Sequence, residues 1–302
     1  MKYLSGYSLI IMLFLQFFQS CGEQHHEEEY TDEFTYETEA AVETIRELSE
    51  VRKIFYDLYS PVEAGNIFDQ IGAVYDPYLL NPPENATNYN TSSKIALNLG
   101  VYGADLSFCR LFGQTQESIN YLTVIYRLAG DLGISGELIE ETDEIIKQAL
   151  VSHPDTIFNI ATRLYLNAEK QLKESNRESA TVLILTGGWI EALYITTSFY
   201  DPLEDEDELI IQLAGQKYSL ERLISLMNNF RNDPAVLEYI FKLKPLAEEF
   251  SEIEIFFDEG GVDIDTISRT ITATSEPELK FSHDNLEKIA DLVASIRYDI
   301  IK

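Results

Sequence analysis

Apolar residues recur every three or four positions along most of this chain, the spacing of one face of an α-helix. The first such series predicts a long amphipathic helix: Val42, Ile45, Leu48, Val51, Phe55 and Leu58. Further helices should begin where capping residues or a helix-initiating proline stand, at Ser60-Pro61, Ser135, Asn176 and Asp233-Pro234. A last series predicts one more buried helix face, made of Leu286, Ile289, Leu292, Val293, Ile296 and Ile300. The chain is therefore expected to fold as a mainly α-helical bundle.

Two segments depart from helical spacing. Residues 76–92 hold Pro77, Pro82 and Pro83 among asparagines and predict one long loop. Strand-like alternation is found only in 253–275, where Ile253–Phe257 and Thr266–Thr272 flank Glu259-Gly260-Gly261. This arrangement predicts a small β-hairpin near the C-terminus.

The order of the helical segments repeats along the chain. Residues 66–75 align with 156–165, residues 93–108 align with 179–194, and Leu128-Ala129-Gly130 aligns loosely with Leu213-Ala214-Gly215. We interpret this as a duplicated three-helix unit, residues 61–134 and 154–230, within one helical domain spanning 39–302. The alternative is that two unrelated amphipathic helical segments align about this well.

Charge limits the classes of partner. The chain carries 22 basic and 52 acidic residues, a formal net charge of −30, and 45% of its residues are hydrophobic. That hydrophobic fraction is enough for a packed core and excludes wholesale disorder. The negative charge repels phosphate backbones and anionic headgroups, so nucleic acid is excluded as a partner.

The first twenty residues have the layout of a secretory signal. A basic Lys2 precedes the apolar run Leu9–Leu15, and the small residue Ser20 stands directly before Cys21. The run is too short to span a bilayer, which takes about 20 apolar residues. Phe18-Gln19-Ser20-Cys21 resembles a bacterial lipobox, although Phe18 and Gln19 depart from its preferred residues. Residues 1–20 are thus predicted to be a lipoprotein signal peptide and Cys21 the lipidated residue; the alternative is an ordinary signal that contains a cysteine.

The segment that follows, residues 21–38, is predicted to be an extended acidic tether, because a block of like charges repels itself. Its acids include Glu23, Glu27, Glu28, Glu29, Asp32, Glu33 and Glu37. Acidic residues after a lipidated cysteine resemble the surface-export signal of Bacteroidota lipoproteins. The simpler interpretation is a solvated leash between the lipid and the folded part.

Two acids stand inside apolar, glycine-containing helical stretches: Asp105 follows Gly100 and Gly103, and Glu191 follows Gly187-Gly188. Glycine costs about 1 kcal/mol in a helix interior, so these glycines need a packing or access reason. A buried acid also needs a partner. Structural ion pairs with Arg110, Arg127 or Arg163 are one interpretation. Carboxylates that face each other and hold a cation, or act as acid and base, are the alternative.

Amides and aromatic residues close to these acids complete a candidate pocket. Gln114 and Gln116 stand in Gly113–Tyr121, a predicted helix corner, where such residues cap a helix by default or, alternatively, line a polar ligand pocket with Trp189 and Tyr102. Cys109 stands in an apolar stretch and is expected to be a buried, inert thiol.

Familiar catalytic motifs are absent from the sequence, including a nucleophile elbow, HExxH, a phosphate loop and a dinucleotide fingerprint. We therefore assign no catalytic residue, no metal ligand and no cofactor, and favour a binding or structural module over an enzyme. A carboxylate-based enzyme or a cation site that uses Asp105 and Glu191 is the alternative. Gly113–Gln116, Gly187–Glu191, the signal and the acidic tether together resemble an uncharacterised, mainly helical family of Bacteroidota lipoproteins, and the resemblance implies no activity. The expected protein is an outer-membrane lipoprotein, facing the periplasm or the cell surface, that is anchored in the bilayer through acylated Cys21 and binds an envelope protein or a small ligand.

Overall fold

The computed structural model of the chain describes residue 68 and residues 71–134, 154–202, 207–256, 262–265, 270–273 and 278–302. The predicted signal, Cys21, the tether, the helix over 42–58 and the helix starts at Ser60-Pro61 and Ser135 lie outside these residues. The described chain divides into a helical body and a separate unit between Ile255 and Leu279.

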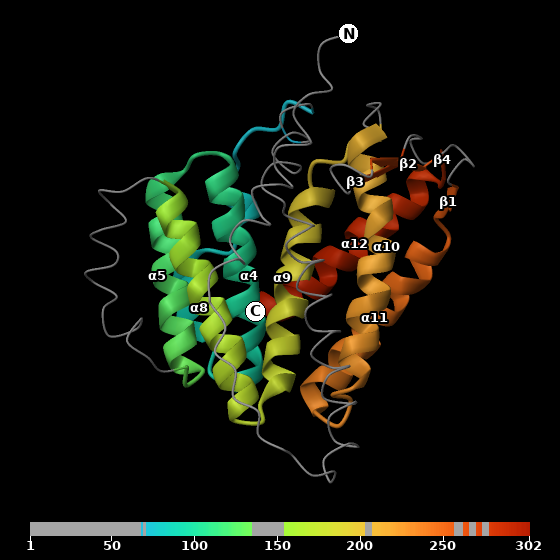
Figure 1. Ribbon diagram of the computed structural model, residues 1–302. Coiled ribbons are helices and arrows are strands. Elements are labelled where there is room, and N and C mark those ends of the chain that lie inside the picture. Colours follow the sequence, from blue (N-terminus) through green and yellow to red (C-terminus); the bar gives the residue numbers. More distant parts are fainter. Residues whose placement is uncertain are drawn as a thin grey trace, which may run out of the picture. The chain divides into compact units, whose positions relative to one another are not determined.

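The predicted mainly α-helical bundle is confirmed (Figure 1). Its described helices are α4 (Ser92–Leu111), α5 (Thr115–Asp131), α8 (Pro154–Glu174), α9 (Glu178–Thr197), α10 (Asp207–Asn228), α11 (Pro234–Ser251) and α12 (His283–Ile301). The predicted face of the last helix is confirmed as well, since Leu286, Ile289, Val293, Ile296 and Ile300 are buried and Leu292 is half-buried.

Helices α4 and α9 form the centre of the body. Their C-terminal ends meet in an aromatic cluster, in which the rings of Phe108 and Phe199 lie 6.1 Å apart, so the two helices run in the same direction. Helix α9 packs against α4, α8, α10, α11 and α12. Of the described helices it alone is long and apolar enough to span a membrane, and 83% of its most apolar stretch is buried in the bundle, as in the core helix of a folded domain.

Glycine sets the distance between these two helices. A Cβ on Gly100 would lie 1.9 Å from the Ile184 carbonyl oxygen, and a Cβ on Gly187 would lie 1.9 Å from that of Leu97. Both positions are therefore restricted to glycine by close backbone approach. A third glycine, Gly103, leaves room for Tyr165 of α8, whose hydroxyl donates a 2.6 Å hydrogen bond to the Leu99 carbonyl.

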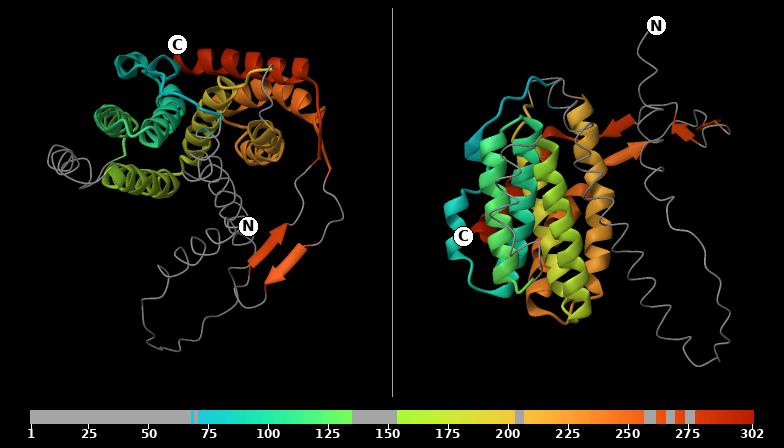
Figure 2. Two further views of the ribbon diagram at one scale, coloured as in Figure 1. Left: turned by 90° about the horizontal axis from the view of Figure 1, so that it is seen from above. Right: turned by 60° about the vertical axis from the view of Figure 1, so that its left-hand side comes forward.

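Helix α12 crosses α9 and α4 on the face opposite α5 and α8 (Figure 2). It pairs with α11 through Lys242–Asp299 (3.1 Å) and through Asn285, whose amide donates to the carbonyl of Glu249 (2.9 Å). Because these contacts join opposite ends of the two helices, α11 and α12 are antiparallel. The face that α12 presents to α9 and α4 carries the site described below.

The helix starts depend on capping, with one difference from the sequence prediction. Asp233 caps α11 as expected, accepting from the amides of Ala235 (2.9 Å) and Val236 (3.4 Å), and Pro234 fills the first turn. Asn176 does not begin α9; it takes a positive φ of 54°, a conformation that asparagine tolerates, and the helix begins two residues later. The predicted loop over 76–92 contains two short 3₁₀ helices, η2 (Pro77–Leu79) and η3 (Pro83–Asn88).

The small β-structure near the C-terminus is present, but its pairing differs from the predicted one. Strand β2 (Val262–Asp265) pairs antiparallel with β3 (Thr270–Ala273), Val262 opposite Ala273, whereas β1 (Glu254–Phe256) pairs with β4 (Glu278–Lys280). The expected pairing of 253–257 with 266–272 is therefore wrong. The observed β2–β3 hairpin closes over only the four residues between its strands, which costs less chain entropy than the longer connection across Glu259-Gly260-Gly261.

Candidate functional site

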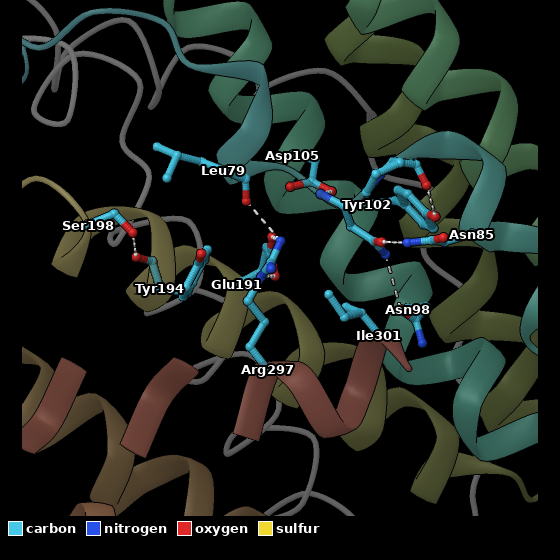
Figure 3. A network of polar contacts seen from close by, with 12 residues as sticks. Leu79, Asn85, Asn98, Tyr102, Asp105, Glu191, Tyr194, Ser198, Arg297 and Ile301 are labelled. Carbon is cyan, nitrogen blue, oxygen red and sulfur yellow. Dashed lines mark hydrogen bonds and ion pairs between the residues drawn. The ribbon is translucent and has the colours of Figure 1, made fainter. Parts of the chain in front are cut away.

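The two acids singled out in the sequence come together at the centre of the body. Asp105 projects from α4 and Glu191 from α9, and both side chains are completely buried. Because the two helices are parallel and in close contact, both acids lie in the same part of the body (Figure 3), and each carboxyl group shifts the pKa of the other.

Arg297 of α12 neutralises Glu191. Its Nε donates to Glu191 Oε2 and one Nη to Oε1, each at 2.7 Å, so both carboxylate oxygens are satisfied by one guanidinium. The same Nη also donates to the Leu79 carbonyl oxygen at 2.8 Å, and the guanidinium lies 4.1 Å from the centroid of the Tyr194 ring. These contacts join α9, α12 and the 77–89 loop (Figure 3).

Asp105 has fewer donors than an ionised carboxylate needs. Its Oδ2 accepts from the backbone N–H of Asn81 at 3.3 Å, and its Oδ1 has no hydrogen-bond partner in the described structure. Burial, and then the nearby charge of Glu191, raise the pKa of Asp105 well above its usual value, with Arg297 opposing them. The pKa of Glu191 is raised by burial too, and there Arg297 opposes the shift directly.

A network of asparagine and tyrosine side chains lies beside the acids (Figure 3). The side-chain amide of Asn81 donates from Nδ2 to Tyr89 Oη (3.0 Å) and to Asn98 Oδ1 (3.4 Å). Asn98 in turn donates to the Ile300 carbonyl (3.0 Å), and Tyr89 donates to that of Ile301 (3.2 Å). The network therefore attaches the 77–89 loop and the end of α12 to α4.

The remaining residues of the predicted pocket are dispersed. Tyr102 is buried and its hydroxyl donates to the Pro82 carbonyl (2.9 Å), while the Trp189 indole donates to Gln216 of α10 (3.3 Å). Gln114 precedes α5 and donates to the Phe112 carbonyl (3.1 Å); Gln116 is exposed and donates to Asn120 (3.3 Å). The structure thus brings Asp105, Glu191 and Tyr102 into one region and places both glutamines at the helix corner, in local contacts.

The cation that pairs with the acids is not one of those named from the sequence. Arg127 forms an exposed contact with Asp131 (3.7 Å), and Arg110 lies over the Phe158 ring at 4.3 Å. The partner is Arg297, 106 residues from Glu191. The helical spacing in the sequence could have identified Arg297. It follows Val293 by four positions and precedes Ile300 by three, which places a charged residue on the apolar face of its helix.

Access from solvent to the acids is closed in the described structure. A small pocket beside the α4–α5 corner is lined by residues that include Arg110, Gly113, Thr115 and Ser118, and neither acid lines it. This pocket has room for about one water molecule. Among the described residues no group of three or more His, Cys, Asp or Glu side chains is placed to hold a metal ion.

Cys109 is buried as predicted. Burial raises the pKa of its thiol to about 12, and its Sγ lies 3.6 Å from the Tyr75 hydroxyl. A thiol in this state is protonated at neutral pH and is a poor nucleophile.

No protein-family profile, no curated protein and no solved structure matches this chain. Its function is therefore argued from its own residues.

Proposed function

We propose that this chain is a lipid-anchored protein of the bacterial cell envelope whose helical body serves as a binding or structural module rather than as an enzyme. In this proposal Cys21 carries the lipid, residues 21–38 hold the body away from the outer membrane, and the body meets its partner in the periplasm or at the cell surface. The partner is an envelope protein or a small ligand.

The observation that supports a non-enzymatic role is the sealed state of the central acids. A catalytic carboxylate must reach its substrate within hydrogen-bonding distance, directly or through one water. Asp105 and Glu191 have no exposed surface, and both oxygens of Glu191 are occupied by Arg297. A pair held in this way stabilises one arrangement of α4, α9 and α12, which is what a scaffold for binding requires.

Charge favours a particular class of partner. A net charge of −30 repels other acidic surfaces and attracts neutral or basic ones. We therefore expect the partner's contact surface to be neutral or basic. If it is basic, the rate of association should fall as salt is added, because salt screens the attraction between opposite charges.

The anchor is tested in a diderm bacterium by labelling with an alkyne fatty acid, followed by membrane fractionation. The full chain should incorporate the label and sediment with outer membranes, and Cys21→Ser should do neither. Cys109→Ser is the matched control, because it removes the other cysteine of the sequence and should leave labelling unchanged. Equal labelling of wild type and Cys21→Ser would contradict the proposed anchor.

The alternative function, a cation site or carboxylate-based enzyme that uses Asp105 and Glu191, has a separate test. The full chain is titrated with Ca²⁺ and Mn²⁺ by calorimetry, alongside Asp105→Asn and the exposed-site control Asp291→Asn. The proposal expects the three proteins to behave alike. Saturable binding that is lost only in Asp105→Asn would establish the alternative.

A further inference from the structure

We propose that Asp105 is kept as a neutral carboxylic acid in the folded protein. Its protonation stabilises the packing of α12 and the 77–89 loop against α4 and α9. The proposal concerns the interior of the body and does not depend on what the protein binds. It rests on the charge balance, the hydrogen bonds and the position of the three central side chains.

The charge balance requires one neutral acid. Two carboxyl groups, those of Asp105 and Glu191, share one buried site with a single guanidinium, that of Arg297. If both acids were ionised, the site would carry one uncompensated negative charge out of contact with water, a state that proteins avoid by shifting the pKa of a group until it is neutral.

The hydrogen bonds identify which acid holds the proton. Arg297 donates to both oxygens of Glu191, so a proton on either oxygen would meet an N–H donor instead of an acceptor. Asp105 Oδ1 lacks any partner as long as the acid is treated only as an acceptor. A proton on Asp105 turns that group into a donor, for which the neighbouring Glu191 carboxylate is an acceptor, so the buried Oδ1 need not stay without a partner.

No other described group near Asp105 supplies a second positive charge. The remaining titratable side chains that interact with it electrostatically are tyrosines and one cysteine, and burial raises the pKa of each, so all are neutral at physiological pH. They are Tyr75, Tyr89, Tyr102, Cys109 and Tyr121. Glu191 from α9 and Arg297 from α12 are thus the charges that face Asp105 in the described structure.

The elements that cover the acids are those that an ionised Asp105 would displace. Arg297 belongs to α12, and the Leu79 carbonyl and Asn81 amide that complete the site belong to the loop. Two adjacent carboxylates repel each other, and contact with water relieves the repulsion. Because α4 and α9 are locked together at Gly100 and Gly187, water enters by movement of α12 and the loop.

The sign of the pH effect follows from proton linkage. Between the ordinary aspartate pKa of about 3.9 and the raised pKa of the folded state, the native protein holds one proton that the unfolded chain has lost, so stability falls as pH rises. The expected change in the unfolding equilibrium constant is about tenfold for each pH unit in that interval.

The test compares the full chain with Asp105→Asn, which has the shape of the neutral acid but cannot lose a proton. Urea unfolding is measured from pH 5 to 9, and the ratio of the two unfolding constants cancels the titration of all other groups. The wild-type constant should rise relative to the variant by about tenfold per unit up to the raised pKa and then level off. A ratio that does not change with pH would overturn the proposal.

Two further measurements keep the test decisive. Infrared spectroscopy of the wild type at pH 7 should show the carbonyl band of a protonated carboxylic acid, and a spectrum without it would overturn the proposal even if Asp105→Asn fails to fold.

Hydrogen exchange at the backbone amide of Asn81 and in α12 should accelerate with pH in wild type relative to Asp105→Asn, while exchange in α5 should not differ. Equal acceleration of exchange in α5 would show that the opening is not confined to α12 and the 77–89 loop, and would overturn the proposal.

Discussion

Gly100 and Gly187 occupy equivalent places where α4 and α9 approach each other. Each faces a carbonyl oxygen of the other helix, and in both cases that carbonyl lies three residues before the partner glycine, at Ile184 and at Leu97. The contact therefore has local twofold symmetry that relates Leu97 to Ile184 and Gly100 to Gly187. This relation differs by one residue from the sequence alignment, which pairs Leu97 with Leu183. The duplication of a three-helix unit stays a prediction.

Alanine at either glycine should destabilise the protein strongly. A methyl group 1.9 Å from a backbone oxygen cannot be accommodated unless the helices separate. We expect Gly100→Ala and Gly187→Ala each to lower the free energy of unfolding by about 3 kcal/mol or more, measured by urea denaturation.

Two other helical glycines serve as controls for this prediction. Gly130 of α5 and Gly215 of α10 have open space where a Cβ would stand. Alanine at either should raise the free energy of unfolding by about 0.5–1 kcal/mol, because glycine disfavours a helix interior. A similar loss at all four positions would contradict the assigned close approach.

Breaking the central ion pair should cost far more than breaking a surface pair. Arg297→Met leaves Glu191 buried without its cation and should lower the free energy of unfolding by about 3–5 kcal/mol. Glu191→Gln should cost less, because Asp105 stays in the site and can ionise beside Arg297. The double variant should recover part of this loss, since no unpaired charge is left. Thermal and urea unfolding of the four proteins give the coupling energy.

The matched control is the Lys280–Glu254 pair, whose Nζ–Oε1 distance is also 2.7 Å but whose side chains are 71% and 50% exposed. Lys280→Met should change stability by less than about 1 kcal/mol. If Arg297→Met costs no more than Lys280→Met, the ion pair is not what holds α12 in place.

The Tyr102 hydroxyl should contribute to stability because it attaches a buried ring to the exposed Pro82 of the 77–89 loop. Tyr102→Phe removes the donor to the Pro82 carbonyl and should lower the free energy of unfolding by about 0.5–1.5 kcal/mol, the net contribution of one hydrogen bond. Tyr298→Phe is the control: its side chain is 58% exposed, and the change should be within about 0.5 kcal/mol. Urea denaturation distinguishes the two, and equal effects would count against the role assigned to Tyr102.

Cys109 should resist alkylation while the protein is folded. A Cys21→Ser background leaves a single thiol, whose pKa of about 12 keeps it protonated at pH 8. We expect iodoacetamide to modify it slowly in buffer and quickly in denaturing urea, followed by mass spectrometry. Comparable rates in both conditions would show that the thiol is accessible in the native state.

The sequence predicted the helical class and the two central acids for related physical reasons. Apolar spacing reports directly on helix faces, and an acid among apolar residues and glycines, such as Asp105 or Glu191, conflicts with its surroundings unless it has a partner. The partner itself was missed, because a contact between residues 191 and 297 depends on how α12 crosses α9, and no local pattern encodes that crossing. The buried Asn98 was missed for the same reason, since its acceptor is the Ile300 carbonyl.

The pairing of the short strands could not be predicted either. Residues 253–257 and 266–272 both have strand-like composition, and composition does not specify which strand is the neighbour. The β2–β3 hairpin uses Val262–Asp265, a four-residue alternation of apolar and acidic side chains that is too short to stand out in the sequence.

The order in which the chain is made has a consequence for the Glu191–Arg297 contact. Glu191 emerges from the ribosome 106 residues ahead of the guanidinium that neutralises it. During that interval α9 is an apolar segment with an acid that has not yet met its cation, and the centre of the body cannot close. We therefore expect the body to complete its fold only after α12 has been synthesised.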